Sequence, residues 1–174
     1  MESGESGDDW NREVLSIGKL GAGLGFATIM GIATFYIFGD RSSESVDLVP
    51  DDPLVVERGA KVYAEHCASC HGNDLQGQPN WRARDKDGYL PAPPHDESGH
   101  TWHHSDALLF KLTKYGLSDT AGVDYKTRMP AYDGVLSDSD IVAVLSYIKS
   151  QWPTRIRERH DRMNENAKRN ANSR

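Results

Sequence analysis

Residues 67–71 have the sequence Cys67-Ala68-Ser69-Cys70-His71. Two cysteines that are separated by two residues and followed directly by histidine form the attachment motif of a c-type haem. On one helical turn the two thiols reach the vinyl groups of a haem and form thioethers, while the imidazole meets the iron as an axial ligand. The motif therefore predicts one covalent haem c, with Cys67 and Cys70 as attachment points and His71 as a ligand.

Other uses of the cysteine pair fit the sequence less well. A structural zinc site needs four ligands, and these are the only two cysteines of the chain. A disulfide or a thioredoxin-like redox pair is a further alternative, but neither requires the histidine that follows. The histidine therefore favours haem over zinc and over thiol redox chemistry.

Length and charge limit the remaining interpretations. The chain has 174 residues and a formal net charge of −6 at neutral pH, enough for one modest domain with extensions. Residues 40–153 carry 18 acidic and 11 basic side chains, whereas residues 154–174 carry 3 acidic and 7 basic ones. An acidic body argues against nucleic-acid binding and is compatible with docking on a basic partner.

An uncharged stretch near the amino terminus predicts a membrane anchor. Residues 1–19 form a polar lead, and residues 20–38 then contain no charged side chain. As a helix those residues would span about 28 Å, close to the hydrocarbon thickness of a bilayer. A cleaved signal peptide is the alternative, but its cleavage site should follow a shorter apolar run, and Gly39-Asp40-Arg41 offers no good site.

Small residues recur along the predicted anchor. Gly21, Gly25 and Gly31 lie at spacings that place small residues on one helical face, where membrane helices can approach closely. The spacing indicates either a contact with another membrane helix or the ordinary abundance of glycine in such segments.

The segment after the anchor is polar. Residues 39–53 are acidic and lack a hydrophobic period, which predicts a linker. A flexible linker of this length has a root-mean-square reach of about 20 Å. We therefore expect a small domain that turns above the membrane and meets only near neighbours.

Three helices are predicted in the domain that follows. The first begins near Pro53, with Asp51 and Asp52 as capping candidates, and delivers Cys67 to the haem. A second, over residues 106–115, is bounded by Ser105 and a glycine, and a third follows Ser137 and stops before Pro153. Each has apolar residues at helical spacing.

The stretch from about residue 54 to residue 152 resembles the class I monohaem cytochromes c. In that family the first and last helices cross at a glycine and pack aromatic rings around it. Gly59 and Tyr63 on the first predicted helix, with Val144 and Tyr147 on the last, match this pattern. The resemblance implies an all-α class I cytochrome c fold in residues 54–153, around one covalent haem and preceded by a single transmembrane helix.

The same resemblance implies a second axial ligand. Met129, followed by Pro130 shortly before the last helix, matches the methionine that ligates the iron in this family. A thioether suits the role because soft sulfur stabilises the ferrous state and raises the reduction potential. The metal ligands implied for this chain are thus His71 and Met129.

The region between the haem motif and the last helix should shape the haem pocket. Residues 72–94 are rich in turn formers and include Trp81, Arg82, Arg84 and Tyr89. These side chains would either contact haem propionates or cover the haem. Further on, four histidines raise the question of a second metal site, although their spacing does not clearly make a three-ligand face; they are His95, His100, His103 and His104.

The carboxy-terminal residues 154–174 lack an apolar stripe and are rich in arginine. They predict a solvated helix or disorder, and the alternative is that the arginines contact anionic lipid or an acidic partner.

Taken as a family member, the chain is expected to be an electron-transfer protein, not an enzyme. The resemblance implies a single-pass protein of the bacterial cytoplasmic membrane with its haem domain in the periplasm. Its implied partners are a quinol:cytochrome c reductase as donor and a terminal oxidase or reaction centre as acceptor. The alternatives are the cytochrome c subunit of a periplasmic dehydrogenase or larger membrane redox complex, and a gas-binding haem protein in which Met129 would be labile.

Overall fold

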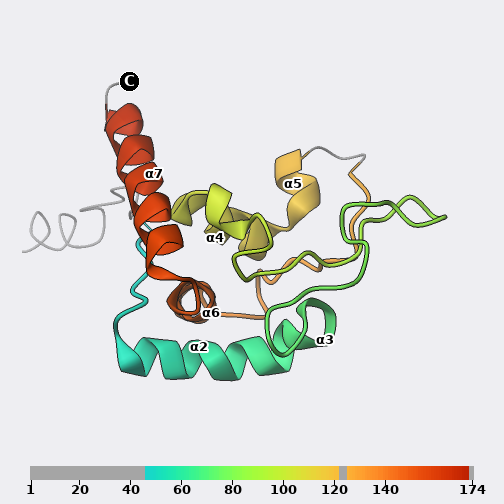
Figure 1. Ribbon diagram of the computed structural model, residues 1–174, viewed down its shortest axis with the longest axis horizontal. Helices are drawn as coiled ribbons and strands as arrows, with labels where there is room; N and C mark the ends of the chain where they lie inside the picture. Colours follow the sequence, from blue (N-terminus) through green and yellow to red (C-terminus); the bar gives the residue numbers. More distant parts are fainter. Residues whose placement is uncertain (1–45, 122–124, 173–174) are drawn as a thin grey trace, which may run out of the picture. The chain divides into compact units, whose positions relative to one another are not determined.

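The structure is a computed structural model that describes residues 46–121 and 125–172 (Figure 1). The predicted transmembrane segment, residues 20–38, lies outside the described residues, as do the glycines expected on its surface. None of the helices in the described part of the chain is long and apolar enough to cross a membrane. The described elements are all helical: α2 (Pro53–His66), α3 (Ala68–His71), η1 (Thr101–His103), α4 (Asp106–Tyr115), α5 (Leu117–Ala121), α6 (Asp138–Ser150) and α7 (Thr154–Asn172).

The three predicted helices are confirmed as α2, α4 and α6, and their caps explain where they begin. The side chain of Asp52 accepts hydrogen bonds from the backbone N–H groups of Leu54 and Val55, and Pro53 occupies the first turn. Ser105 caps α4 in the same way. Ser137 and Asp140 form a capping box at the start of α6, which satisfies two backbone donors.

Helices α2 and α6 cross at a glycine, as expected. In Figure 1, α6 is seen nearly end-on against α2. A Cβ atom on Gly59 would lie 2.0 Å from the carbonyl oxygen of Ala143, so only glycine allows this approach. Beside it the rings of Tyr63 and Tyr147 pack with centroids 5.5 Å apart. The crossing positions the end of α2, and with it Cys67.

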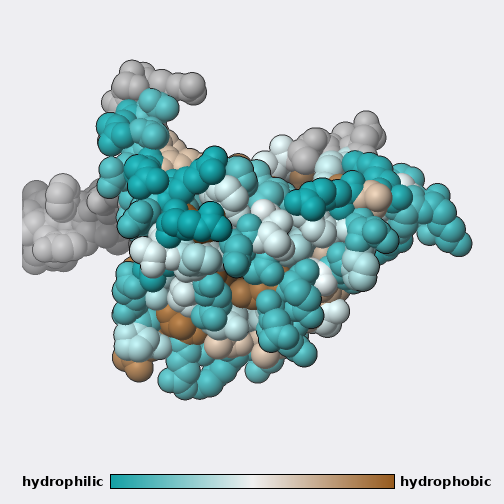
Figure 2. Space-filling view, viewed as in Figure 1, coloured by the Kyte–Doolittle hydropathy of each residue, from teal (hydrophilic) through white to brown (hydrophobic). Residues whose placement is uncertain are grey.

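The core gathers around this crossing. Ile141 and Val144 on α6 are almost completely buried, and Trp152 follows directly after that helix. The connection between α3 and η1, green in Figure 1, extends away from the helices. Figure 2 shows hydrophilic residues over most of this face, including the visible side of α7. The buried apolar cluster consists of Leu48, Val62, Tyr63, Ala68, Leu75, Leu109, Ile141, Val144, Leu145, Ile148, Trp152 and Ile156.

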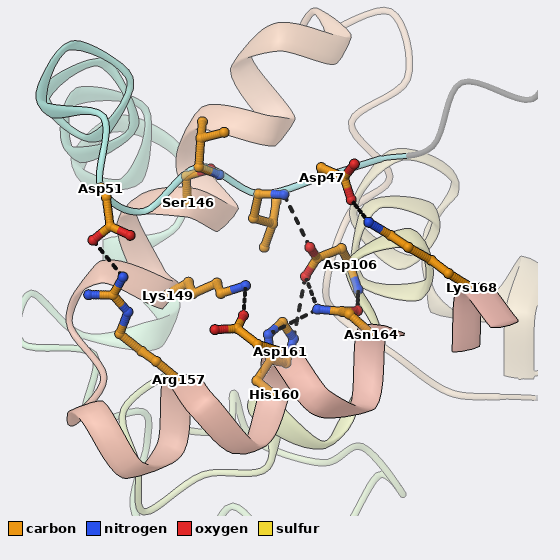
Figure 3. A network of polar contacts seen from close by, with 12 residues as sticks. Asp47, Asp51, Asp106, Ser146, Lys149, Arg157, His160, Asp161, Asn164 and Lys168 are labelled. Atoms are coloured by element: carbon orange, nitrogen blue, oxygen red, sulfur yellow. Dashed lines mark hydrogen bonds and ion pairs between the residues drawn. The ribbon is translucent and has the colours of Figure 1, made fainter. Parts of the chain in front are cut away.

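The carboxy-terminal region differs from the solvated extension that the sequence predicts. Residues Thr154–Asn172 form helix α7, which buries Ile156, His160 and Asn164. Asn164 donates from Nδ2 to Oδ1 of Asp106 over 2.9 Å and accepts at Oδ1 from the Asp106 backbone N–H over 2.8 Å (Figure 3). The helix is therefore fixed to the start of α4 by buried polar contacts.

The end of the expected linker is also part of the domain. Leu48 lies in the core, and its backbone N–H donates to Oδ2 of Asp106 over 3.1 Å. The N–H of Val49 donates to the hydroxyl of Ser146 on α6 over 3.0 Å. An ion pair of 2.6 Å joins Asp51 to Arg157 of α7 (Figure 3). Residues 46–52 are thus held by three helices, which shortens the stretch that can act as a linker.

His160 makes the docking of α7 sensitive to acid. Its Nε2 donates to the carbonyl oxygen of His104 over 2.9 Å, and its Nδ1 accepts from Asn164 over 3.2 Å, so the bonded tautomer is neutral. Burial lowers the pKa of His160, and nearby Lys149 adds to this, against the opposing effect of Asp106. A proton on His160 is therefore less favourable in the folded protein than in the unfolded chain.

We expect the free energy of unfolding to fall as the pH drops below about 6.5, the ordinary histidine pKa. In that range the unfolded state takes up the His160 proton while the folded state does not, which costs at most about 1.4 kcal/mol per pH unit. Denaturant titrations at pH 7.5 and pH 5 will measure this slope. A His160→Gln variant should show a smaller slope, and equal slopes in the two proteins would contradict the prediction.

Candidate functional site

The Cys67–His71 motif forms one helical turn at the end of α2. The backbone N–H of Cys67 donates to Tyr63, and that of His71 donates to the carbonyl oxygen of Cys67, both over 2.9 Å. Cys67 is partly buried and Cys70 is exposed, and both thiols are free. The two thiols and the imidazole therefore project from a single turn, which is the arrangement that attachment to one haem requires.

His71 has the features of a metal-ligating histidine. Its side chain is buried, and Nδ1 lies 2.8 Å from the carbonyl oxygen of Pro93. Because a carbonyl only accepts, Nδ1 carries the proton and Nε2 has a free lone pair. Burial lowers the pKa of His71, against a smaller raising effect of the Pro93 hydrogen bond, so the neutral form is favoured. A neutral imidazole whose other nitrogen donates to a carbonyl is the usual state of a histidine that binds a metal, so the site fits haem iron.

The Cys67 thiol lies in an apolar setting. Burial raises its pKa to about 11, and the neighbouring Cys70 contributes to the shift. A thiol with a raised pKa is a poor nucleophile and a poor metal ligand at neutral pH. Cys67 therefore lacks the lowered pKa that is typical of thiol redox pairs.

Met129 lies in a segment that is fixed close to the cysteine motif. Tyr132 follows three residues after Met129, and its hydroxyl donates to the carbonyl oxygen of His66 over 2.7 Å. His66 directly precedes Cys67. Burial raises the pKa of Tyr132 to about 12, and both Cys67 and Cys70 add to this shift. The backbone N–H of Tyr132 also donates to Thr113 and Lys114 at the end of α4. Tyr132 therefore brings the residues after Met129 beside the turn that carries the thiols.

The four histidines after the turn-rich region do not converge. His100 and His104 have ring centroids 5.5 Å apart, whereas His103 stacks on Trp102. Among the residues that the structure describes, no group of three or more His, Cys, Asp and Glu side chains is placed to hold a metal ion. The structure therefore gives no support for a second metal site there.

His95 has a role that the sequence did not reveal. Its ring stacks on that of His71, with centroids 4.0 Å apart and planes 22° from parallel. Its Nδ1 lies 2.8 Å from the hydroxyl of Thr101, and burial, with smaller contributions from His71 and His100, holds its pKa well below the ordinary value. A neutral His95 thus supports the ring of the predicted ligand. The sequence feature that could have indicated this role is the position of His95 two residues after Pro93, whose carbonyl oxygen accepts from His71.

The side chains considered for the haem propionates all contact other parts of the protein. Arg82 lies over the ring of Trp81, with its guanidinium carbon 4.0 Å from the ring centroid. Arg84 donates to the carbonyl oxygen of Gly88 over 2.6 Å, and the ring of Tyr89 lies under Arg128. These contacts give the projecting connection a structure of its own.

Comparison with known proteins identifies the domain. A family model described as cytochrome c matches residues 56–152, more than half of the chain. The chain is 31% identical over 102 residues to a thiosulfate dehydrogenase of Stutzerimonas stutzeri, which covers 58% of this chain and 29% of that protein. It is 30% identical over 92 residues to the cbb3-type cytochrome c oxidase subunit FixP of a Bradyrhizobium species, which covers 53% of this chain and 26% of that subunit.

A shorter match joins 33 residues, at 48% identity, to FixP of Sinorhizobium medicae, covering 19% of this chain and 11% of that subunit. The chain therefore spans less than a third of the length of these relatives. No solved structure matches it. The family match covers most of α2, all elements from α3 to α6 and the turn that carries both thiols, and the chain belongs to the cytochrome c family, whose members carry covalent haem c and transfer electrons.

Proposed function

We propose that this chain is a membrane-anchored one-electron carrier whose haem is attached through Cys67 and Cys70 and ligated by His71 and Met129. The observation that carries the proposal is the geometry of His71, which is buried with Nδ1 lying 2.8 Å from the carbonyl oxygen of Pro93. With the proton on Nδ1, the lone pair of Nε2 is available for the iron, on the turn that bears both thiols. The cysteines would hold the cofactor in place and the imidazole would define one axial position.

The remaining residues act by positioning. Haem c supplies one-electron redox chemistry when it is bound. Tyr132 holds the Met129 segment near the cysteine turn, so that a thioether can take the second axial position. If His71 and Met129 both ligate the iron, a substrate would find no open position on it, and electron transfer would need no catalytic acid, base or nucleophile.

The proposed location is the bacterial cytoplasmic membrane, with the haem domain in the periplasm. The uncharged run of residues 20–38 supports a single-pass anchor. The proposed donor is a quinol:cytochrome c reductase, and the proposed acceptor is a terminal oxidase or a photosynthetic reaction centre. Similarity to two FixP proteins, which are named as oxidase subunits, supports a place among membrane redox complexes.

A second candidate function is that of the cytochrome c subunit of a periplasmic dehydrogenase or larger membrane redox complex. The similarity to a thiosulfate dehydrogenase over 102 residues favours it. The two functions differ in how stably the chain binds to its redox partner. A subunit should co-purify with a catalytic partner in fixed stoichiometry, whereas a carrier should not.

Replacement of Met129 tests the ligation. We expect the ferric protein to show the weak near-infrared absorption of a sulfur-to-iron bond, and a Met129→Leu variant to lose it. The reduction potential of the variant should fall by about 0.1 V or more, because the thioether stabilises the ferrous state. Its ferrous form should also bind carbon monoxide rapidly at the open axial position. Absorption spectra and a potentiometric titration will measure these changes.

The matched control is Met163→Leu, the same substitution on the partly buried side of α7. It should retain both the absorption band and the potential. A wild-type protein without the sulfur-to-iron band would refute the proposed ligation by Met129.

A further inference from the structure

We propose that the loop of residues 84–89 is a clasp that keeps Met129 on the iron, and that Arg128 is the positioning residue through which it acts. This inference rests on the proposed ligation by Met129. In Figure 1 the loop belongs to the green connection that extends from the helices, and the orange segment after α5 runs beside it. The contact joins residues 43 positions apart in the chain.

The loop of residues 84–89 is shaped by hydrogen bonds among its own residues. The backbone N–H of Asp85 donates to the carbonyl oxygen of Tyr89 over 2.8 Å. In return, Oδ1 of Asp85 accepts from the backbone N–H groups of Asp87 and Tyr89, each over 2.9 Å. Arg84 closes the same turn by donating to Gly88. One carboxylate oxygen of Asp85 is thus used to shape the loop, and Oδ2 faces outward.

Arg128 contacts this loop through two carboxylates and an aromatic ring, and the weakest of these contacts joins its Nη2 to Oδ2 of Asp87 over 4.0 Å. Its Nη1 lies 2.7 Å from Oδ2 of Asp85, and its guanidinium carbon lies 4.0 Å from the centroid of the Tyr89 ring. A guanidinium that stacks on an aromatic face while it pairs with a carboxylate is held in both direction and plane. The neighbouring Lys126 adds a hydrogen bond of 3.1 Å to the carbonyl oxygen of Asp87.

Together with Tyr132, these contacts hold the ligand segment on both sides. Tyr132 fixes the residues after Met129 to α2 and α4. Arg128, the residue directly before Met129, is held by its ion pair with Asp85. Inside this span the hydroxyl of Thr127 accepts from the Met129 backbone N–H over 3.0 Å. If haem is bound and the thioether leaves the iron by an outward movement of this segment, the contacts of Arg128 would oppose that movement. Release of Met129 should therefore become easier when the Arg128 contacts are lost.

Displacement by free imidazole measures this property. Imidazole binds to the ferric iron only after Met129 has left, so its apparent dissociation constant reports the release. We expect Arg128→Gln and Asp85→Asn, in the full chain with its haem, each to lower that constant by about fivefold, since the contacts are exposed to solvent. Asparagine keeps the acceptor that shapes the loop and replaces only the oxygen that faces Arg128. Without imidazole both variants should keep the sulfur-to-iron absorption.

The two variants also separate the clasp from a simple effect of charge. Arg128→Gln removes a positive charge and Asp85→Asn a negative one, so a field effect on the iron would move the constants in opposite directions. Loss of the clasp lowers both imidazole dissociation constants. The constant of the double variant should differ little from that of either single variant. The matched control is Arg58→Gln, because Arg58 forms a pair of the same length with Asp140 between α2 and α6 and is exposed to a similar degree. It should leave the constant unchanged.

The possible failures can be told apart. If the wild type shows the sulfur-to-iron band but neither variant changes the imidazole constant by more than about twofold, or the two change it in opposite directions, the clasp is refuted and the proposed ligation stands. If the wild type lacks the band, both the ligation and the clasp fail.

Discussion

Replacing both Cys67 and Cys70 with serine is expected to abolish covalent haem attachment. A hydroxyl does not form the thioether, and the described residues contain no other cysteine. Haem in the variant should separate from the polypeptide in acidified organic solvent and on a denaturing gel, whereas wild-type haem should stay with the chain. Haem staining of that gel measures the difference.

The control lies within the same turn. Ser69 is exposed, between the two cysteines, and a Ser69→Ala variant changes neither thiol nor the buried His71. It should keep its covalent haem in full. Covalent haem in the double cysteine variant would mean that another side chain forms the bond, and it would contradict the assignment of this motif.

The sequence predicted the parts of the fold whose causes are local. Helices α2, α4 and α6 were predicted because each has a cap and an apolar period within its own residues. The crossing at Gly59 was predicted from resemblance, and the structure shows its physical basis in the close carbonyl of Ala143. The attachment turn was equally local, since its spacing is readable within five residues.

The parts that the sequence did not predict depend on partners far along the chain. Among the side chains of α7 whose burial the structure describes, residues 154–170, the one large buried apolar residue is Ile156, and the other buried ones are the polar His160 and Asn164. A pattern search for apolar stripes therefore interprets α7 as solvated. The contact between Asp106 and Asn164 joins positions 58 apart, and no sequence pattern around either residue predicts it.

The same reasoning applies to the site. The turn with both thiols and His71 could be predicted, but the stacking of His95 on His71 and the contact of Arg128 with Asp85 could not. Both depend on the path of the connection between α3 and η1. A path that is set by turns and by single side-chain contacts leaves no periodic signal in the sequence.

The second large effect is expected in helix α7, where replacing Asn164 with leucine should lower the free energy of unfolding by about 3 kcal/mol. Leucine has a similar shape but no polar atoms. The change would leave the Asp106 backbone N–H and the Nδ1 of His160 without the partner that each has in Figure 3. Oδ1 of Asp106 would keep only its longer contact with Nε2 of His160, over 3.5 Å. These groups are buried, so each loses a hydrogen bond that water cannot readily replace. Guanidinium titration of the haem-containing protein measures the loss.

The same substitution at Asn166 is the matched control, because Asn166 lies on the exposed side of α7 and bonds only within that helix, to Arg169. It should change the free energy of unfolding by less than about 0.5 kcal/mol. A second measurement follows from Oδ2 of Asp106, which accepts from the backbone N–H of Leu48. If Asn164 holds that carboxylate in place, hydrogen exchange at Leu48 should become faster in Asn164→Leu and stay unchanged in Asn166→Leu. Equal stability and equal exchange in the two variants would show that Asn164 does not hold Asp106 in place, and they would contradict the prediction.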